Sequence, residues 1–151
     1  MKYRRNIGLG DSLAIQMADF VQKLDWHPDL LIPIPLGKRR YQERGYNQVG
    51  LVAKPLAYEL GMAYSPRALW KTRETRSQVG LSISERRENV RRAYQADPKA
   101  VNRRKILLMD DVATTGSTIS SASEVLLSAG AAEVFALTIA RALSHHDLNR
   151  V

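Results

Sequence analysis

The 151-residue chain contains no cysteine, only three histidines, and no apolar run near the ~20 residues that a membrane-spanning helix needs. The missing cysteines exclude disulfide bonds and cysteine-ligated zinc, and they are compatible with a reducing compartment. Two of the histidines, His145 and His146, lie near the polar C-terminus, which argues against a three-histidine metal site. Because the first residues also lack the apolar core of a signal peptide, we expect a cytoplasmic protein without membrane insertion.

The composition is that of a globular protein with an excess of positive charge. Hydrophobic residues make up 44% and charged residues 25%, which predicts one folded domain over residues 1–151. The net charge of +8 and the pI near 10 indicate an anionic partner. Nucleic acid and a small polyphosphate are the two candidates, and total charge does not separate them.

Strand and helix patterns alternate along the chain. Asp11 and Ser12 precede an apolar stripe at helical spacing, and Gly8 and Gly10 before them indicate a loop, since the third glycine of a dinucleotide fingerprint is missing. Residues 29–35 predict a strand that ends at prolines.

A second helix is expected over residues 47–60, with Asn47 as a structural cap and Gly61 just past its end, followed by a brief strand at 62–65. Further on, residues 105–110 predict a strand, 118–129 a helix and 134–140 a strand covered on both faces. This alternation predicts an α/β fold, a parallel sheet with flanking helices.

Residues 67–95 differ in character and predict a basic flexible-loop insertion. The part from 67 to 92 carries three acidic residues and eight basic ones, namely Arg67, Lys71, Arg73, Arg76, Arg86, Arg87, Arg91 and Arg92. The pattern SISE at 82–85 is typical of a helix start. Aromatic residues do not alternate with the arginines along the sequence, although a site for single-stranded nucleic acid would favour such an alternation of stacking rings and cations.

The stretch ILLMDDVATTGSTI at residues 106–119 combines an apolar run, two aspartates and a turn of small hydroxyl residues. A turn that leads into a helix offers free main-chain N–H groups and the positive end of the helix dipole, which suits a phosphate dianion. Gly116 permits close approach of the backbone, and the neighbouring hydroxyls are donors. Two carboxylates beside a phosphate suit a sugar diol, a bound magnesium ion, or both.

Two other interpretations of this stretch fit less well. The magnesium-binding strand of a P-loop ATPase has the same pattern, but no G-x-x-x-x-G-K-[ST] loop occurs upstream. A strand end with solvated acids before a capped helix explains Thr118, but not two acids followed by a run of small polar residues.

Three separated motifs resemble those of the ComF family of predicted phosphoribosyltransferases, which has a type I phosphoribosyltransferase fold. They are PIPLGKRRYQERGYNQ (33–48), TRSQVGLSISERRENVRRAY (75–94) and ILLMDDVATTGST (106–118). Family members usually carry an N-terminal cysteine-rich zinc ribbon. This cysteine-free chain is therefore either a naturally short member or a fragment that begins after the ribbon.

The resemblance implies a site for phosphoribosyl pyrophosphate (PRPP). Asp110 and Asp111 would hold the ribose hydroxyls and, directly or through the substrate, a magnesium ion. The 5-phosphate would lie against Ala113, Thr114, Thr115, Gly116, Ser117 and Thr118. Pyrophosphate would be held by Leu36, Gly37, Lys38 and Arg39. The basic loop would close over the site and bring Lys71, Arg73 or Arg76 to the pyrophosphate.

The activity that the resemblance implies is transfer of 5-phosphoribosyl from PRPP to an unidentified nitrogen acceptor, with release of pyrophosphate. The alternative is an accessory protein on the same fold that binds PRPP or single-stranded nucleic acid and acts with the DNA-uptake machinery. Dimers are common in this fold family, and the sequence leaves the oligomeric state open.

Overall fold

The structure is a computed structural model that describes residues 3–72, 93–113 and 115–141. Its helices are α1 (Tyr3–Gln22), α2 (Lys38–Arg44), α3 (Gln48–Glu59), α5 (Pro98–Val101) and α6 (Ser117–Ser128). Its strands are β1 (Leu30–Pro33), β2 (Ala63–Tyr64), β3 (Leu69–Lys71), β4 (Tyr94–Ala96), β5 (Lys105–Ala113) and β6 (Glu133–Arg141). None of the described helices combines the length and apolar character needed to cross a membrane.

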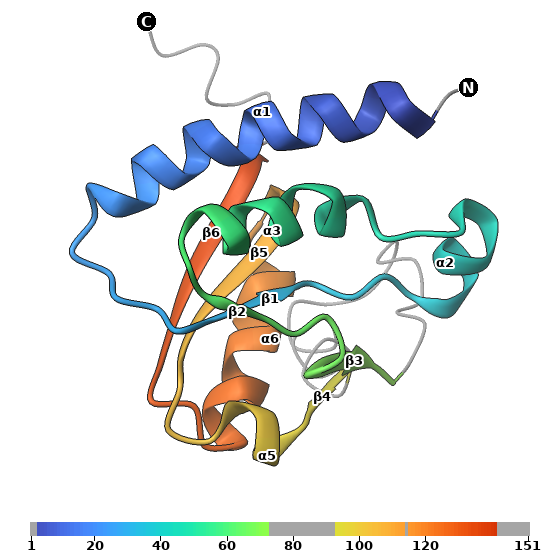
Figure 1. The fold of residues 1–151 in the computed structure, drawn as a ribbon. Coiled ribbons are helices and arrows are strands. Elements are labelled where there is room, and N and C mark those ends of the chain that lie inside the picture. Colours follow the sequence, from blue (N-terminus) through green and yellow to red (C-terminus); the bar gives the residue numbers. More distant parts are fainter. Residues whose placement is uncertain (1–2, 73–92, 114, 142–151) are drawn as a thin grey trace, which may run out of the picture.

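Four strands form a parallel sheet in the order β2-β1-β5-β6, which confirms the predicted α/β class. Alternation along β5 divides the core between its two faces. Leu107 and Met109 pack with α1 and α3, while Ile106 and Leu108 pack on the opposite side with α6. Figure 1 shows α1 and α3 on one side of the sheet and α6 on the other. Both faces of β5 are therefore packed against helices just before its aspartates.

Helix α3 begins where the sequence predicts, because Asn47 caps it. Its side-chain oxygen accepts a hydrogen bond from the main-chain N–H of Val49 at 3.2 Å. Its amide nitrogen donates to the carbonyl of Ile34 at 2.8 Å. The one side chain thus joins the start of α3 to the segment that follows β1. The helix ends before Gly61, whose φ of +63° is the left-handed value expected there.

The prediction of a loop before Asp11 is wrong, because Gly8 and Gly10 lie inside α1. A Cβ atom on Gly10 would lie only 2.6 Å from the carbonyl oxygen of Leu51 in α3. That carbonyl lies four residues before Pro55, which has no N–H to donate to it. Glycine at position 10 therefore lets the two helix backbones approach closely where the proline interrupts the hydrogen bonding of α3.

The prediction that residues 134–140 are covered on both faces is also wrong. β6 is the last strand of the described sheet, and Ala136 and Ala140 are exposed. Leu137 is the residue of β6 that is buried in the core. The apolar run of β6 belongs to an edge strand whose exposed side chains are small. A sequence pattern of this kind does not distinguish such a strand from a central one.

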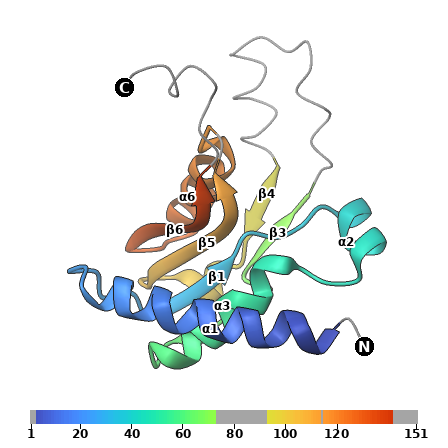
Figure 2. The ribbon, with the colours of Figure 1, turned by 90° about the horizontal axis from the view of Figure 1, so that it is seen from above.

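The strands β3 and β4 pair in antiparallel fashion and form the base of the basic segment, residues 67–95. Lys71 pairs with Tyr94 and Leu69 with Ala96, so both ends of the segment at 67–95 have regular structure that the sequence pattern did not indicate. Figure 2 shows this hairpin outside the parallel sheet, between α6 and α2. The expected helix start at 82–85 lies outside the described residues.

Candidate functional site

The two aspartates lie within β5 rather than at its end. The strand continues past them, and Val112 and Ala113 still pair with β6. Asp110 follows Leu108 on the face that packs against α6, and Asp111 follows Met109 on the other. The expectation that the strand ends at the two aspartates is therefore wrong. The pairing of β5 with β6 continues on both sides of Asp110 and Asp111.

Each carboxylate accepts a hydrogen bond from the next residue's main chain. The N–H of Asp111 donates to Oδ1 of Asp110 at 2.9 Å, and the N–H of Val112 donates to Oδ1 of Asp111 at 2.8 Å. These local bonds hold both side chains near the carboxyl end of β5.

Asp110 is a buried acid with a perturbed pKa. The residue is only 8% exposed. Burial raises the pKa of its carboxyl to about 6, against the opposing effect of the main-chain hydrogen bond, and the neighbouring Asp111 raises it further. A buried carboxyl with such a shift is a frequent mark of a functional site.

Tyr94 is a neighbour of this acid that sequence analysis did not single out. It lies in β4, is buried, and packs in the same core cluster as Leu108. Burial and then the charge of Asp110 raise the pKa of the Tyr94 hydroxyl to about 12. The base of the basic segment therefore lies within electrostatic reach of the acid. No local pattern marks Tyr94, because its position depends on the β3–β4 pairing.

The turn after β5 forms a small hollow at the start of α6. Gly116 is the N-cap, with a left-handed φ of +75° and no atom within 4 Å of where a Cβ would lie. Thr115 and Ser117 lie beside it, with their hydroxyl oxygens 3.0 Å apart. The hollow is lined by Asp110, Val112, Ala113, Gly116, Ser117, Thr118 and Ile119. Asp111 does not line it, and Thr114 lies outside the described residues.

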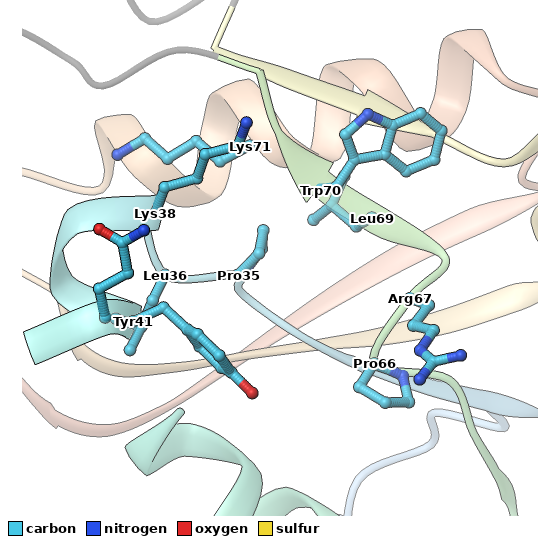
Figure 3. A pocket seen from close by; sticks show the side chains of 10 residues that line it. Pro35, Leu36, Lys38, Tyr41, Pro66, Arg67, Leu69, Trp70 and Lys71 are labelled. Atoms are coloured by element: carbon cyan, nitrogen blue, oxygen red, sulfur yellow. The ribbon is translucent and has the colours of Figure 1, made fainter. Parts of the chain in front are cut away.

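A second and larger cleft of about 520 Å³ lies between α2 and β3. It brings together Leu36, Lys38 and Lys71, three of the residues expected at the pyrophosphate (Figure 3). Gly37 is buried as the N-cap of α2, and Arg39 forms an ion pair with Glu43 at 2.9 Å. Arg73 and Arg76 lie outside the described residues.

Sequence reasoning missed the aromatic and basic side chains that complete this cleft. Tyr41, Arg67 and Trp70 line it with Pro35, Gln42, Pro66 and Leu69. Trp70 lies between Arg67 and Arg73 in the sequence, whereas Tyr41 comes from α2, so the sequence did not indicate that the two rings line one cleft. Within the part of the chain that the structure describes, this cleft and the hollow at α6 share no lining residue.

Comparison with known proteins identifies relatives that are named for DNA utilization and for competence. The DNA utilization protein YhgH of Escherichia coli O157:H7 is 38% identical over 116 residues, which cover 77% of this chain and 51% of that protein. Competence protein F of Haemophilus influenzae is 35% identical over 120 residues, covering 76% and 51%. The chain is a ComF homologue. This confirms the resemblance carried by the three motifs, although no protein-family model matches the chain.

This ComF homologue spans about half the length of the relatives it matches.

Solved structures show its fold to be that of the type I phosphoribosyltransferases. Glutamine PRPP amidotransferase from B. subtilis matches with a TM-score of 0.57 and 22% identity, covering 89% of this chain and 26% of that one. Adenine phosphoribosyltransferase from Thermoanaerobacter pseudethanolicus matches with a TM-score of 0.55 and 17% identity, covering 86% and 67%.

Proposed function

We propose that this chain binds PRPP and transfers its 5-phosphoribosyl group to a nitrogen acceptor, releasing pyrophosphate. The observation that carries the proposal is that β5 leads through a short turn directly into α6, and that the hollow lies at this turn. A buried acid, a left-handed glycine and the first residues of a twelve-residue helix lie around one small space. The phosphoribosyltransferase fold and the motif resemblance support the same ligand.

In this proposal the 5-phosphate lies in the hollow. Main-chain N–H groups at the start of α6 and the hydroxyls of Thr115, Ser117 and Thr118 donate to it. Gly116 leaves the space above the turn open. Asp110 and Asp111 are kept from the phosphate by their own charge and instead accept hydrogen bonds from the ribose diol.

The pyrophosphate is assigned to the segment after β1 and to the basic segment. Leu36, Gly37 and Lys38 supply main-chain and ammonium donors, and Lys71 enters the same cleft from β3. Arg39 is less suited to this role than Lys38, because Glu43 already neutralises it. Arg73 and Arg76 remain candidates from the part of the chain outside the described residues.

Magnesium fits this donor set only together with the substrate. Among the described residues no group of three or more His, Asp or Glu side chains is close enough to hold a metal ion alone. Mg²⁺ commonly keeps several waters and binds through one or two carboxylates plus substrate phosphates. Asp110 and Asp111 would supply the carboxylates, and the ion would stabilise negative charge on the departing pyrophosphate.

The chemistry needs no side-chain nucleophile. Loss of pyrophosphate leaves an oxocarbenium-like ribose and an increasingly negative leaving group. Lysines stabilise the leaving group, and the aspartates tolerate the positive sugar. A closed basic segment would exclude water, which prevents hydrolysis of PRPP.

A screen for PRPP-dependent pyrophosphate release tests the activity and identifies the acceptor. Purified protein with Mg²⁺ and PRPP is offered single nucleobases, ammonia and other nitrogen nucleophiles. Release above the rate without acceptor, and its loss in the Lys71→Ala variant, are expected for at least one of them. Release that is equally fast without protein, for every acceptor, would reject the transferase assignment.

A second candidate is an accessory role in DNA handling on the same fold. The names of the relatives and the net charge of +8 favour it. A basic surface of this kind would bind single-stranded nucleic acid with strong salt dependence. The absence of an electrophoretic shift with single strands at low salt would reject this role. The two functions are compatible with one another.

A further inference from the structure

The α2–β3 cleft has features that pyrophosphate binding does not use. Lys38 and Lys71 lie along one edge of it in Figure 3, whereas Tyr41 and Trp70 lie on opposite sides and Arg67 lies at a third position on the rim. Its volume of about 520 Å³ falls in the range of roughly 300–1,000 Å³ common for small-molecule sites. None of the described residues that line it has an acidic side chain.

Both aromatic side chains of this cleft are partly exposed, and for Trp70 the reason is the alternation along β3. Leu69 is 1% exposed and fills the core, so its neighbour Trp70 in β3 faces outward and is 41% exposed. Tyr41 is 54% exposed on α2. Neither ring is needed to close the described core. Together with Pro66 they offer flat apolar surface to a planar group.

Two of the cations at this cleft have no acidic partner among the described residues. Lys38 and Arg67 form no ion pair or side-chain hydrogen bond with any residue that the structure describes. Arginine offers several donors suited to phosphate. Aromatic faces beside unneutralised cations suit a planar ring that carries a nearby anionic group. A wholly apolar ligand would leave the cations unused, and inorganic anions would leave the rings unused.

We propose that the aromatic part of this cleft, formed by Tyr41, Pro66, Arg67 and Trp70, binds a nucleobase together with its phosphate. The base stacks on Trp70 with Tyr41 facing it, and the phosphate lies on Arg67. The unit is either a free nucleotide or one nucleotide of a single strand. This binding does not depend on PRPP, because none of these four residues belongs to the PRPP site assigned above.

The test uses the intact chain with a fluorescein-labelled single-stranded oligothymidylate, and binding is followed by anisotropy over a series of salt concentrations, with the variants compared at the same concentrations. Trp70→Ala should weaken binding about tenfold, as loss of one base–aromatic stack does. Arg67→Gln should weaken it several-fold and lower the salt slope by about one. The matched controls are Tyr58→Ala, which removes an exposed tyrosine of α3, and Lys54→Gln, which removes an exposed cation of the same helix. Both should stay within about twofold of the parent.

Two further arms identify the ligand and locate it. Thymidine 5′-monophosphate and thymidine are titrated as competitors. Displacement by the monophosphate at concentrations where thymidine has no effect identifies a free nucleotide as sufficient. Binding of the strand without such displacement identifies a unit of a strand. The Trp26→Phe variant leaves Trp70 as the sole tryptophan, and its emission should be quenched by the bound base.

The proposal is overturned if neither strand nor monophosphate binds, or if Trp70 emission does not change on binding. It is also overturned if the control variants weaken binding as much as Trp70→Ala does. That last result would assign the binding to charge spread over the surface. Thermal melting of every variant shows whether it is folded, and Trp70→Phe, which keeps a smaller ring, should retain part of the affinity.

Discussion

Replacing Asp110 by asparagine should stabilise the protein at neutral pH. The carboxyl is 8% exposed, and burial raises its pKa from 3.8 to about 6. Above pH 6 the group is ionised in both folded and unfolded chains, and the folded state carries the cost of the buried charge. The difference between these two pKa values corresponds to on the order of 3 kcal/mol. The asparagine side chain would keep the acceptor for the N–H of Asp111 and remove the charge.

The sign of the pH dependence follows from the direction of the shift. Below pH 3.8 the carboxyl is protonated in both states, so the cost is absent. It develops as pH rises from 3.8 to about 6 and is fully present above that value. The advantage of Asp110→Asn over the parent should therefore be large at pH 7.5 and small at pH 4.

Urea unfolding at these two pH values measures the difference. At pH 7.5 a gain of up to ~3 kcal/mol corresponds to a melting temperature roughly 6–12 °C higher for a chain of this size. Asp111→Asn is the matched control, since this half-buried neighbour should change stability by less than ~1 kcal/mol. A parent that is as stable as Asp110→Asn at pH 7.5, or an equal gain at both pH values, would refute the reasoning.

Substitutions at three further sites, each with a control variant, test other features of the fold and the site. Gly10→Ala should destabilise the fold by ~1–3 kcal/mol in urea unfolding, because its Cβ would lie 2.6 Å from the Leu51 carbonyl, whereas the exposed Ser12→Ala should not; equal stabilities would contradict the close helix contact. Asn47→Ala should cost ~1–2 kcal/mol, and Asn47→Asp should recover only the cap to Val49, so full recovery would show that the bond to Ile34 contributes nothing. Gly116→Ala and Gly61→Ala should each cost about 1 kcal/mol, since both glycines have a positive φ and open space, but only Gly116→Ala should weaken PRPP binding; equal affinities would remove the turn from the phosphate site.

Local patterns predicted most of the parallel sheet and its helices. The strand at 29–35, the helix over 47–60 and the helix over 118–129 were each found within a few residues of their bounds in the structure, because apolar period and capping residues act within one element. The sequence did not predict that α1 extends back to Tyr3. Glycine is needed at position 10 of this helix because Leu51 of another helix lies so close, and this contact has no local sequence signal.

The residues of the candidate sites likewise fall into those with a local sequence signal and those without one. Asp110 and the turn at Gly116 are close in sequence, so their pattern alone indicated a phosphate and diol site. Tyr94 and the pair of Tyr41 with Trp70 depend on the β3–β4 pairing and on where α2 lies, neither of which has a local signal. Such strands of three residues are too short to show alternation.

Calorimetric titration of the intact chain with PRPP in the presence of Mg²⁺ tests the central claim most directly. We predict saturable binding to the parent, and its loss in the folded double variant with Asp110→Asn and Asp111→Asn. Unchanged affinity in that variant, or no heat with the parent at millimolar PRPP and no thermal stabilisation, would contradict the assignment of this site.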